Sequence, residues 1–321
     1  MERLHLGAAI PDRFRDGIIA LGNFDGFHLG HQAVVGRAVA RAFHEGRPTI
    51  VATFDPHPVS YFKPELPPFR LTSLDQRERL FGAAGADAML VFEFDRTLAL
   101  TSADDFVARL LAGEIGASGV VTGEDFTYGV NRSGTVTTLR SVGAAHGIAA
   151  EAITSVAING EAISSSRIRE ALVAGDPGRA TRLMSRPFAI EGLVEHGDKR
   201  GRTLGYPTAN LRLGGYLRPA YGIYAVTVRL DDGQERPGVA SLGVRPTFEP
   251  PVELLETYLF DFDGDLYGHA IEVSFHAFLR GEEKFDSMDA LVDRGGQVLS
   301  DEIGPDRKFT VAAVDERRET H

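Results

Sequence analysis

The sequence predicts two domains: an α/β domain built on a parallel sheet, and then an antiparallel β-barrel that ends in a C-terminal helix. The chain has 321 residues, about twice the usual domain size of roughly 100–200 residues. Short apolar runs alternate with helical patterns up to residue 184, which is typical of a parallel sheet covered by helices. From Ser185 onward, strand-like runs follow one another without a helix between them, which is the pattern of an antiparallel barrel or sandwich. We therefore expect domains at 1–184 and 185–321.

Five runs of apolar residues predict buried strands in the first domain. They are Gly17–Leu21, Thr49–Phe54, Met89–Phe94, Gly119–Thr122 and Ile148–Val156. Helical patterns cover Gln32–Glu45, Ser73–Ala84, Ala103–Glu114, Thr135–His146, Ser165–Ala174 and Gly178–Met184. The Pro-dense segment 63–68 predicts a surface loop. Because parallel sheets bind ligands beyond the carboxyl ends of their strands, we expect the site of this domain there.

The second domain is predicted from five strand-like runs and one late helix. The runs are Phe188–Val194, Ile223–Leu230, Gly238–Gly243, Leu254–Phe260 and Ala270–Leu279. The helix begins near Ser287, and the glycines at 295 and 296 weaken it. Aspartates at 261, 263 and 265 have the spacing of a calcium loop, but His269 and Ile271 stand where later ligands belong. We expect a hairpin turn at these aspartates instead.

Composition and charge exclude several classes of function. The chain has 34 Lys and Arg against 45 Asp and Glu, a net charge of −11, which argues against nucleic acid or an anionic membrane as the main partner. It has no Cys, which excludes disulfides and Cys-ligated metals. Neither a signal peptide nor a transmembrane segment is expected. A cytoplasmic protein is the expectation, with a homo-oligomer left open.

The segment Leu21–His31 follows the first predicted strand and opens the first helix. Free backbone N–H groups and the helix dipole favour a bound phosphate at such a helix start. His28 and His31 lie three residues apart and therefore on one side of the helix, and glycines at 22, 26 and 30 allow a tight turn. The plain alternative is an ordinary turn with two surface histidines, or half of a metal site. The phosphate-loop motifs of Walker ATPases and dinucleotide-binding domains are absent from the sequence.

Four motifs of the first half together carry a family resemblance. His-Leu-Gly-His at 28–31 resembles the His-x-Gly-His signature of nucleotidylyltransferases. With Thr-Phe-Asp-Pro-His-Pro at 53–58, Gly-Glu-Asp-Phe-Thr-Tyr-Gly at 123–129 and Ile-Ser-Ser-Ser-Arg-Ile-Arg at 163–169, the chain resembles the FMN adenylyltransferase half of the prokaryotic bifunctional riboflavin kinase/FAD synthetase family. The resemblance covers nearly all of residues 17–175 and implies a Rossmann-like nucleotidylyltransferase domain.

Adenylyl transfer needs donors that stabilise charge on the phosphoryl oxygens. We expect His28 and His31 to be these catalytic donors. The resemblance implies ATP contacts from Gly22, Asn23, Phe24, Asp25, Gly30, Ser165, Ser166 and Arg169, and flavin contacts from His57, Asp125 and Phe126. The alternatives are a serine N-cap beside a surface arginine, turn chemistry at Asp125, and a merely rigid loop around His57.

A second motif opens the second domain. Glycines at 192, 197, 201 and 205 precede Pro-Thr-Ala-Asn at 207–210, and such a loop can wrap a phosphate with its N–H groups. Thr208 and Asn210 offer hard oxygen ligands on one face of an extended segment, which suits Mg²⁺ carrying nucleotide phosphates. With further segments at 222–225, 238–248, 256–268 and 278–280, residues 186–286 resemble riboflavin kinase. This resemblance implies ATP contacts from Gly197, Lys199, Gly201, Arg202, Gly205, Pro207, Thr208 and Asn210, of which Thr208 and Asn210 are the metal ligands.

The resemblance also assigns Glu256 as the catalytic base and places Arg280 beside the flavin. Phosphoryl transfer to a primary alcohol needs an acceptor for its proton, and a carboxylate on a strand supplies one. Strand alternation puts Glu256 on one face with Leu254 and Tyr258. If that face is the barrel interior, an unpaired carboxylate there points to function. A solvent-facing strand glutamate is the alternative.

The sequence thus predicts a bifunctional transferase of flavin-cofactor biosynthesis. It phosphorylates riboflavin to FMN and adenylylates FMN to FAD, with ATP as co-substrate and Mg²⁺ as cofactor in both steps. One alternative is an adenylyltransferase for another phosphate compound, but the Pro-Thr-Ala-Asn motif of the second domain argues against it. The other is a flavin-binding or flavin-sensing protein with degraded catalysis. The evidence against that alternative is that the predicted catalytic and metal-binding residues are intact: His28, His31, Thr208, Asn210 and Glu256.

Overall fold

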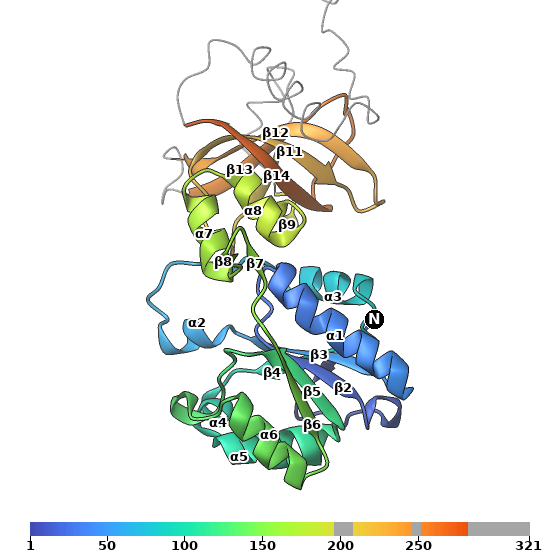
Figure 1. Cartoon of the computed structure of the whole chain (residues 1–321). Coiled ribbons are helices and arrows are strands. Elements are labelled where there is room, and N and C mark those ends of the chain that lie inside the picture. Colours follow the sequence, from blue (N-terminus) through green and yellow to red (C-terminus); the bar gives the residue numbers. More distant parts are fainter. Residues whose placement is uncertain (196–207, 246–251, 282–321) are drawn as a thin grey trace, which may run out of the picture. The chain divides into compact units, whose positions relative to one another are not determined.

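The computed structural model describes residues 1–195, 208–245 and 252–281 (Figure 1). The chain divides into two compact units. The first holds residues 1–67 and 72–165, and the second holds residues 68–71 and the chain from residue 166 onward. The helix expected from Ser287 lies outside the described residues.

The first unit is built on a six-stranded sheet in the order β1-β4-β3-β2-β5-β6. All neighbouring strands in it run parallel. The strands are β1 (Glu2–His5), β2 (Ile18–Leu21), β3 (Thr49–Asp55), β4 (Ala88–Glu93), β5 (Gly119–Gly123) and β6 (Ala149–Ile153). Because β2 to β5 are buried almost throughout, they read as continuous apolar runs rather than as alternating ones.

Helices cover both faces of this sheet, as Figure 1 shows. Helices α1 (Leu29–Glu45) and α3 (Leu74–Ala83) pack on the face that carries Ile18 and Ala20. Helix α5 (Ala103–Asp105), its π-helical continuation η2 (Phe106–Ile115) and α6 (Val136–Ala145) pack on the face that carries Ile19 and Leu21. The shorter elements are η1 (Asp12–Phe14), α2 (Pro58–Phe62), α4 (Arg96–Leu100), η3 (Val130–Arg132) and the small ribbon of β7 (Ala157–Ile158) and β8 (Glu161–Ala162).

The second unit is an antiparallel barrel with two helices beside it. Its sheet has the order β10-β13-β12-β11-β14-β9, and the backbone N–H of Glu195, just after β9, donates to the carbonyl of Asn210 in β10, which closes the circle. The strands are β9 (Phe188–Leu193), β10 (Thr208–Arg212), β11 (Gly222–Arg229), β12 (Glu235–Arg245), β13 (Val252–Leu259) and β14 (Ala270–Arg280). Fully buried side chains that include Phe188, Val226, Leu255 and Phe275 fill the interior.

Helices α7 (Ser165–Val173) and α8 (Pro177–Met184) connect to this barrel rather than to the parallel sheet. The Leu172 carbonyl accepts from the N–H of Ala220, and α8 packs against β9 and β14. Residues 68–71 also belong to this unit, because Arg70 pairs with the segment around Tyr216. The contacts therefore divide the chain at residue 165, whereas the change of sequence pattern predicts a boundary at 184/185.

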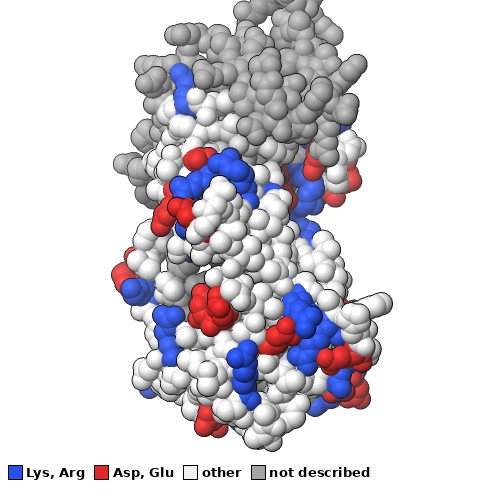
Figure 2. Space-filling model, viewed as in Figure 1, with Lys and Arg blue, Asp and Glu red and all other residues white. Residues whose placement is uncertain are grey.

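The predicted fold class, a Rossmann-like α/β domain followed by an antiparallel barrel, is confirmed. One local expectation is wrong. The aspartates at 261, 263 and 265 do not lie in a hairpin, because β13 pairs with β10 and β12 while β14 pairs with β11 and β9. Among the described helices, none is long and apolar enough to cross a membrane. On the face drawn in Figure 2, acidic and basic side chains lie interspersed in small groups.

Candidate functional site

The first candidate site lies where the order of the parallel sheet reverses. Strand β2 has β3 on one side and β5 on the other. Because these strands run parallel, the segments that follow β2 and β5 leave the sheet at the same edge. Segment 22–28 follows β2, and Asp125 and Phe126 follow β5. Such a switch point at the carboxyl ends of the strands is where open α/β sheets bind their ligands.

The two histidines of the loop lie against each other at the start of α1. His28 is the N-cap residue, and its Nδ1 accepts from the backbone N–H of His31 at 3.3 Å. The imidazole rings stack with centroids 3.6 Å apart and planes 18° apart. A Cβ at Gly30 would lie 3.1 Å from the His28 ring, a tighter contact than most Cβ atoms make, so a larger residue there would crowd this stack. Because Nδ1 accepts, a neutral His28 carries its proton on Nε2, where it can donate to a ligand.

The loop that leads to these histidines is strained and buried. Phe24 and Phe27 adopt φ values of 51° and 36°, and both rings pack edge-on against Phe81 of α3. Gly22 donates its N–H to the Ala52 carbonyl at 3.2 Å. The side-chain oxygen of Asn23 is buried without a hydrogen-bond partner in the described part of the chain. A buried acceptor of this kind is a candidate for contact with a ligand.

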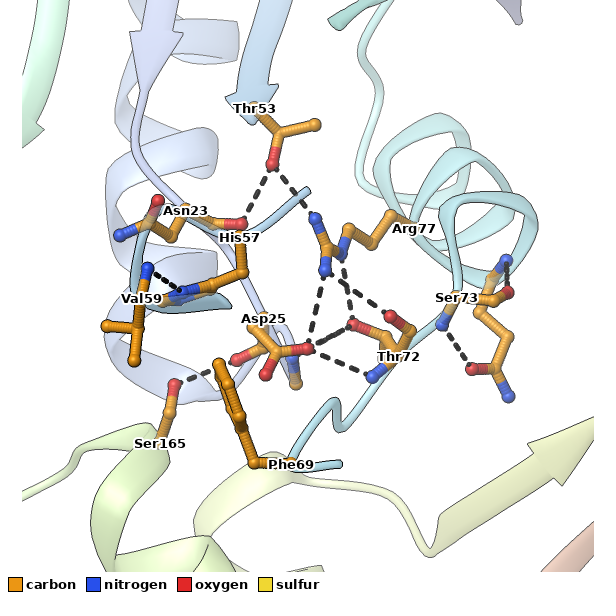
Figure 3. A network of polar contacts seen from close by, with 12 residues as sticks. Asn23, Asp25, Thr53, His57, Val59, Phe69, Thr72, Ser73, Arg77 and Ser165 are labelled. Carbon is orange, nitrogen blue, oxygen red and sulfur yellow. Dashed lines mark hydrogen bonds and ion pairs between the residues drawn. The ribbon is translucent and has the colours of Figure 1, made fainter. Parts of the chain in front are cut away.

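Asp25 lies inside the protein, with 2% of its side chain exposed. Its Oδ1 accepts from the backbone N–H of Thr72 at 3.0 Å and lies 3.4 Å from Nη2 of Arg77 (Figure 3). Ser165 donates its hydroxyl to the Asp25 carbonyl oxygen at 2.8 Å. The structure thus joins Ser165 to the loop, although 140 residues separate the two in sequence.

Two other residues of the serine and arginine motif lie in the second unit. Ser166 is exposed on α7. Arg169 donates its Nε to the Phe69 carbonyl at 2.8 Å, and its guanidinium lies 4.9 Å from the centre of the Phe69 ring. Their ATP contacts remain predictions.

The expected flavin contacts come from the segments after β3 and β5. His57 caps α2, and its Nδ1 accepts from the Val59 N–H at 3.2 Å. The ring of Phe126 lies nearly parallel to that of Tyr128, at 6.0 Å and 15°. Burial, and then the charge of Asp104, raise the pKa of Tyr128 to about 12, so its hydroxyl stays protonated. That hydroxyl is buried without a partner in the described residues.

Sequence reasoning missed an aromatic surface on α2. Tyr61 and Phe62 are 36% and 63% exposed, and both rings make edge contacts with Phe94. The signal in the sequence is the Tyr-Phe pair that stands two residues after Thr-Phe-Asp-Pro-His-Pro and directly before the Pro-dense segment 63–68. Exposed aromatic rings near the end of β3 offer apolar faces to a planar ligand.

The second candidate site is a row of residues across the barrel. In the antiparallel register, Asn210 of β10 lies opposite Glu256 of β13, and Glu256 lies opposite Ser241 of β12. Ser241 in turn faces Ile223 of β11, which faces Arg280 of β14. Directly opposed residues share one face of a sheet, so Asn210, Glu256 and Arg280 are brought to the same face.

This face is not the barrel interior. Leu255 and Thr257, the neighbours of Glu256, are completely buried on the inner side, so Glu256 lies half-buried on the outer side. The argument from burial therefore does not apply to Glu256. The support for its predicted role is its position opposite Asn210.

The described residues fit a magnesium ion that arrives with nucleotide phosphates. Asn210 is 5% exposed, and its side-chain oxygen has no hydrogen-bond partner in residues 1–195, 208–245 and 252–281. Thr208 lies two residues earlier on the same face and borders a hollow in the surface. Val194, Leu259, Phe262, Asp265 and Tyr267 also line this hollow. No cluster of three or more acidic or histidine ligands occurs in the described residues, and nucleotide-bound Mg²⁺ does not require one.

Six of the ATP-binding residues predicted for the kinase belong to the glycine-rich loop before β10. Gly197, Lys199, Gly201, Arg202, Gly205 and Pro207 lie outside the described residues. Their ATP contacts therefore stay predictions.

A glycine-rich loop at the switch point of a parallel sheet, in one chain with a barrel that has a carboxylate opposite an amide, is typical of a nucleotide-dependent transferase of two units. Comparison with known proteins narrows this class. A family model described as FAD synthetase matches residues 10–167, and one described as riboflavin kinase matches residues 184–297. The chain belongs to the bifunctional riboflavin kinase/FMN adenylyltransferase family.

Relatives cover almost the whole chain. A bifunctional riboflavin kinase/FMN adenylyltransferase of Pseudomonas fluorescens is 42% identical over 86% of this chain and 89% of its own length. The protein of the same name from Haemophilus influenzae is 39% identical over 85% of this chain and 89% of its own. A crystal structure of a protein named as a macrolide-efflux protein, from Streptococcus pneumoniae, superposes with a TM-score of 0.79 at 30% identity and covers 94% of this chain and 98% of its own. The resemblance predicted from the motifs is confirmed.

Proposed function

We propose that this chain converts riboflavin to FAD in two steps. Riboflavin and ATP give FMN and ADP in the second unit, and FMN with a second ATP gives FAD and pyrophosphate in the first unit. The observation that carries this proposal is the alignment of Asn210, Glu256 and Arg280 in one row of a barrel that follows a phosphate-loop domain. Family membership over both halves supports the pairing of the two activities.

In the kinase step, Glu256 accepts the proton of the riboflavin primary hydroxyl as its oxygen attacks the γ-phosphorus of ATP. The carboxylate lies opposite Asn210, so the attacking hydroxyl and the nucleotide phosphates meet at one place on the sheet. Thr208 and Asn210 would hold Mg²⁺, which when bound neutralises charge on the phosphates. The half-burial of Glu256 leaves the carboxylate within reach of a substrate on the outer face.

The kinase flavin would extend along the row toward Arg280. Three strand spacings separate Glu256 from Arg280, roughly 14 Å at the usual spacing of neighbouring strands. A riboflavin molecule whose terminal ribityl hydroxyl lies at Glu256 and whose ring system lies toward Arg280 would fit this distance.

In the adenylyltransferase step, a phosphate oxygen of FMN attacks the α-phosphorus of ATP while pyrophosphate leaves. His28 and His31 supply preorganised donors to the phosphoryl oxygens, aided by the N–H groups at the start of α1. Gly22, Asn23 and Ser165 would contact the nucleotide on this loop. The phosphate contacts of Ser166 and Arg169 stay predictions from the family resemblance. On the flavin side, His57, Asp125 and Phe126 contact FMN, and the exposed rings of α2 provide apolar surface.

The test is to incubate the purified full chain with riboflavin, ATP and Mg²⁺ and to separate the flavins. We expect FMN to appear first and FAD to follow. Riboflavin converted to FMN without any FAD would remove the adenylylation step, and flavin bound but unchanged would favour a flavin-sensing protein. A cytoplasmic location fits a reaction that uses ATP twice.

A further inference from the structure

The loop that carries the histidines holds a conformation that its own sequence disfavours. Phe24, Gly26 and Phe27 all have positive φ, at 51°, 83° and 36°. For phenylalanine this region is strained, so surrounding contacts must hold the loop in place. The contacts come from α3 and from Thr72 just before it.

The hydroxyl of Thr72 bonds to three groups at once. It accepts from the backbone N–H of Gly26 at 3.0 Å and from Nε of Arg77 at 3.2 Å, and it donates to Oδ1 of Asp25 at 3.3 Å (Figure 3). A hydroxyl has one donor and two acceptor positions, and here all three are used. Thr72 is 3% exposed, so water does not substitute for these bonds.

Arg77 of α3 contacts the loop at Asp25 and, through Thr53, at Asn23. Its Nη2 lies 3.4 Å from Asp25, and its Nη1 donates at 3.2 Å to the hydroxyl of Thr53, which donates at 2.8 Å to the carbonyl oxygen of Asn23. The side chains of Arg77 and Asp25 are each 2% exposed. The planar guanidinium makes these bonds in several directions, which a lysine ammonium on its flexible stem does not reproduce.

We propose that Thr72 and Arg77 are positioning residues of FMN adenylylation, which act through Asp25 and Gly26 to fix the loop before His28. This role rests on the proposed function. Asp25 then works inside the protein as the anchor of the loop, because its Oδ1 already accepts from two groups of Thr72 and from Arg77. Loss of the Thr72 hydroxyl removes the hydrogen bond that the Gly26 N–H donates to it and lets His28 and the start of α1 move relative to the phosphates.

The test compares Thr72→Val, which keeps shape but lacks the hydroxyl, with Thr72→Ser, which keeps the hydroxyl. Thr122→Val is the matched control, because that fully buried hydroxyl donates to the Leu21 carbonyl at 2.9 Å. Arg77 itself is left intact, since its removal would strand the buried Asp25 charge and could block folding. For each protein, kcat and KM for FMN adenylylation, the rate of riboflavin phosphorylation and the melting temperature are measured.

We expect Thr72→Val to lower kcat for adenylylation on the order of 10- to 10²-fold, with KM for ATP and riboflavin phosphorylation little changed. Thr72→Ser should restore most of kcat, and Thr122→Val should lower the melting temperature without lowering kcat. A wild-type kcat in Thr72→Val overturns the proposal, as does an equal loss of kcat in Thr122→Val. A wild-type protein that forms no FAD from FMN and ATP refutes the proposed function, and the positioning role with it.

Discussion

Asn210 and Glu256 lie directly opposite each other across the β10–β13 pair, on the outer face of the barrel. One is an amide whose oxygen is buried without a partner in the described residues, and the other is a half-buried carboxylate. The pair fits the proposed phosphoryl transfer, in which the amide oxygen can bind a metal ion and the carboxylate can accept the proton of the alcohol.

We predict that Glu256→Gln lowers riboflavin phosphorylation by roughly 10²–10⁴-fold, because it removes the proton acceptor and keeps the shape. Thr208→Ala should instead weaken binding of the magnesium nucleotide, and excess Mg²⁺ should restore part of the rate. Steady-state kinetics at several Mg²⁺ concentrations separate the two effects. A Glu256→Gln protein with the wild-type phosphorylation rate across pH would place the base elsewhere.

His28→Ala and His31→Ala should each slow FMN adenylylation on the order of 10²–10³-fold, the loss expected for one preorganised donor to the transition state. Riboflavin phosphorylation in the same samples should change little, and it reports that the rest of the chain is folded. An equal loss of both activities in a folded variant would contradict the assignment of the α1 start to adenylylation.

A fragment of residues 185–321 should convert riboflavin to FMN and form no FAD, because it lacks His28, His31 and Ser165. The structure adds a comparison with residues 166–321. Leu183 and Met184 of α8 are buried, and α8 packs against β9 and β14, so the shorter fragment exposes apolar surface. We expect the longer fragment to have the higher melting temperature. Absence of kinase activity from both folded fragments would show that the rest of the chain completes the kinase site.

The second unit should lose stability in mild acid through His276. Burial lowers the pKa of His276 from 6.5 to about 4, and its Nε2 lies 2.9 Å from the Thr227 hydroxyl. Between pH 6.5 and 4 the unfolded chain therefore takes up a proton that the folded chain does not. The free energy of unfolding decreases by at most about 3 kcal/mol as the pH is lowered through this range. Urea unfolding from pH 7 to 4 should show a weaker pH dependence for His276→Gln. An unchanged slope would contradict the lowered pKa.

The sequence allowed the parallel sheet, most helices and the barrel to be predicted, because the two hydrophobic periods differ clearly along the chain. Strand β1 was missed, since Glu2–His5 has no apolar run and depends on pairing with β4. Arg77 was missed for another reason. In Leu-Asp-Gln-Arg-Glu-Arg it reads as one of several charges on a solvated helix face, and only the fold shows that it meets Asp25.

The functional residues were predicted in sequence, but their arrangement was not. Separate sequence motifs predicted Asn210, Glu256 and Arg280 as site residues. Their position in one row of the sheet depends on the register of five strands. Register follows from long-range pairing that one sequence does not display. The same holds for Ser165 and Asp25, which 140 positions separate.

The most direct test of the two-step account supplies each variant with each flavin. With ATP and Mg²⁺, His28→Ala given riboflavin should accumulate FMN, and Glu256→Gln should leave riboflavin unchanged but convert added FMN to FAD. A mixture of the two variants should form FAD from riboflavin, because each supplies the step that the other lacks. Failure of Glu256→Gln to adenylylate added FMN, or failure of the folded mixture to form FAD, would contradict the division of the two reactions between the two units.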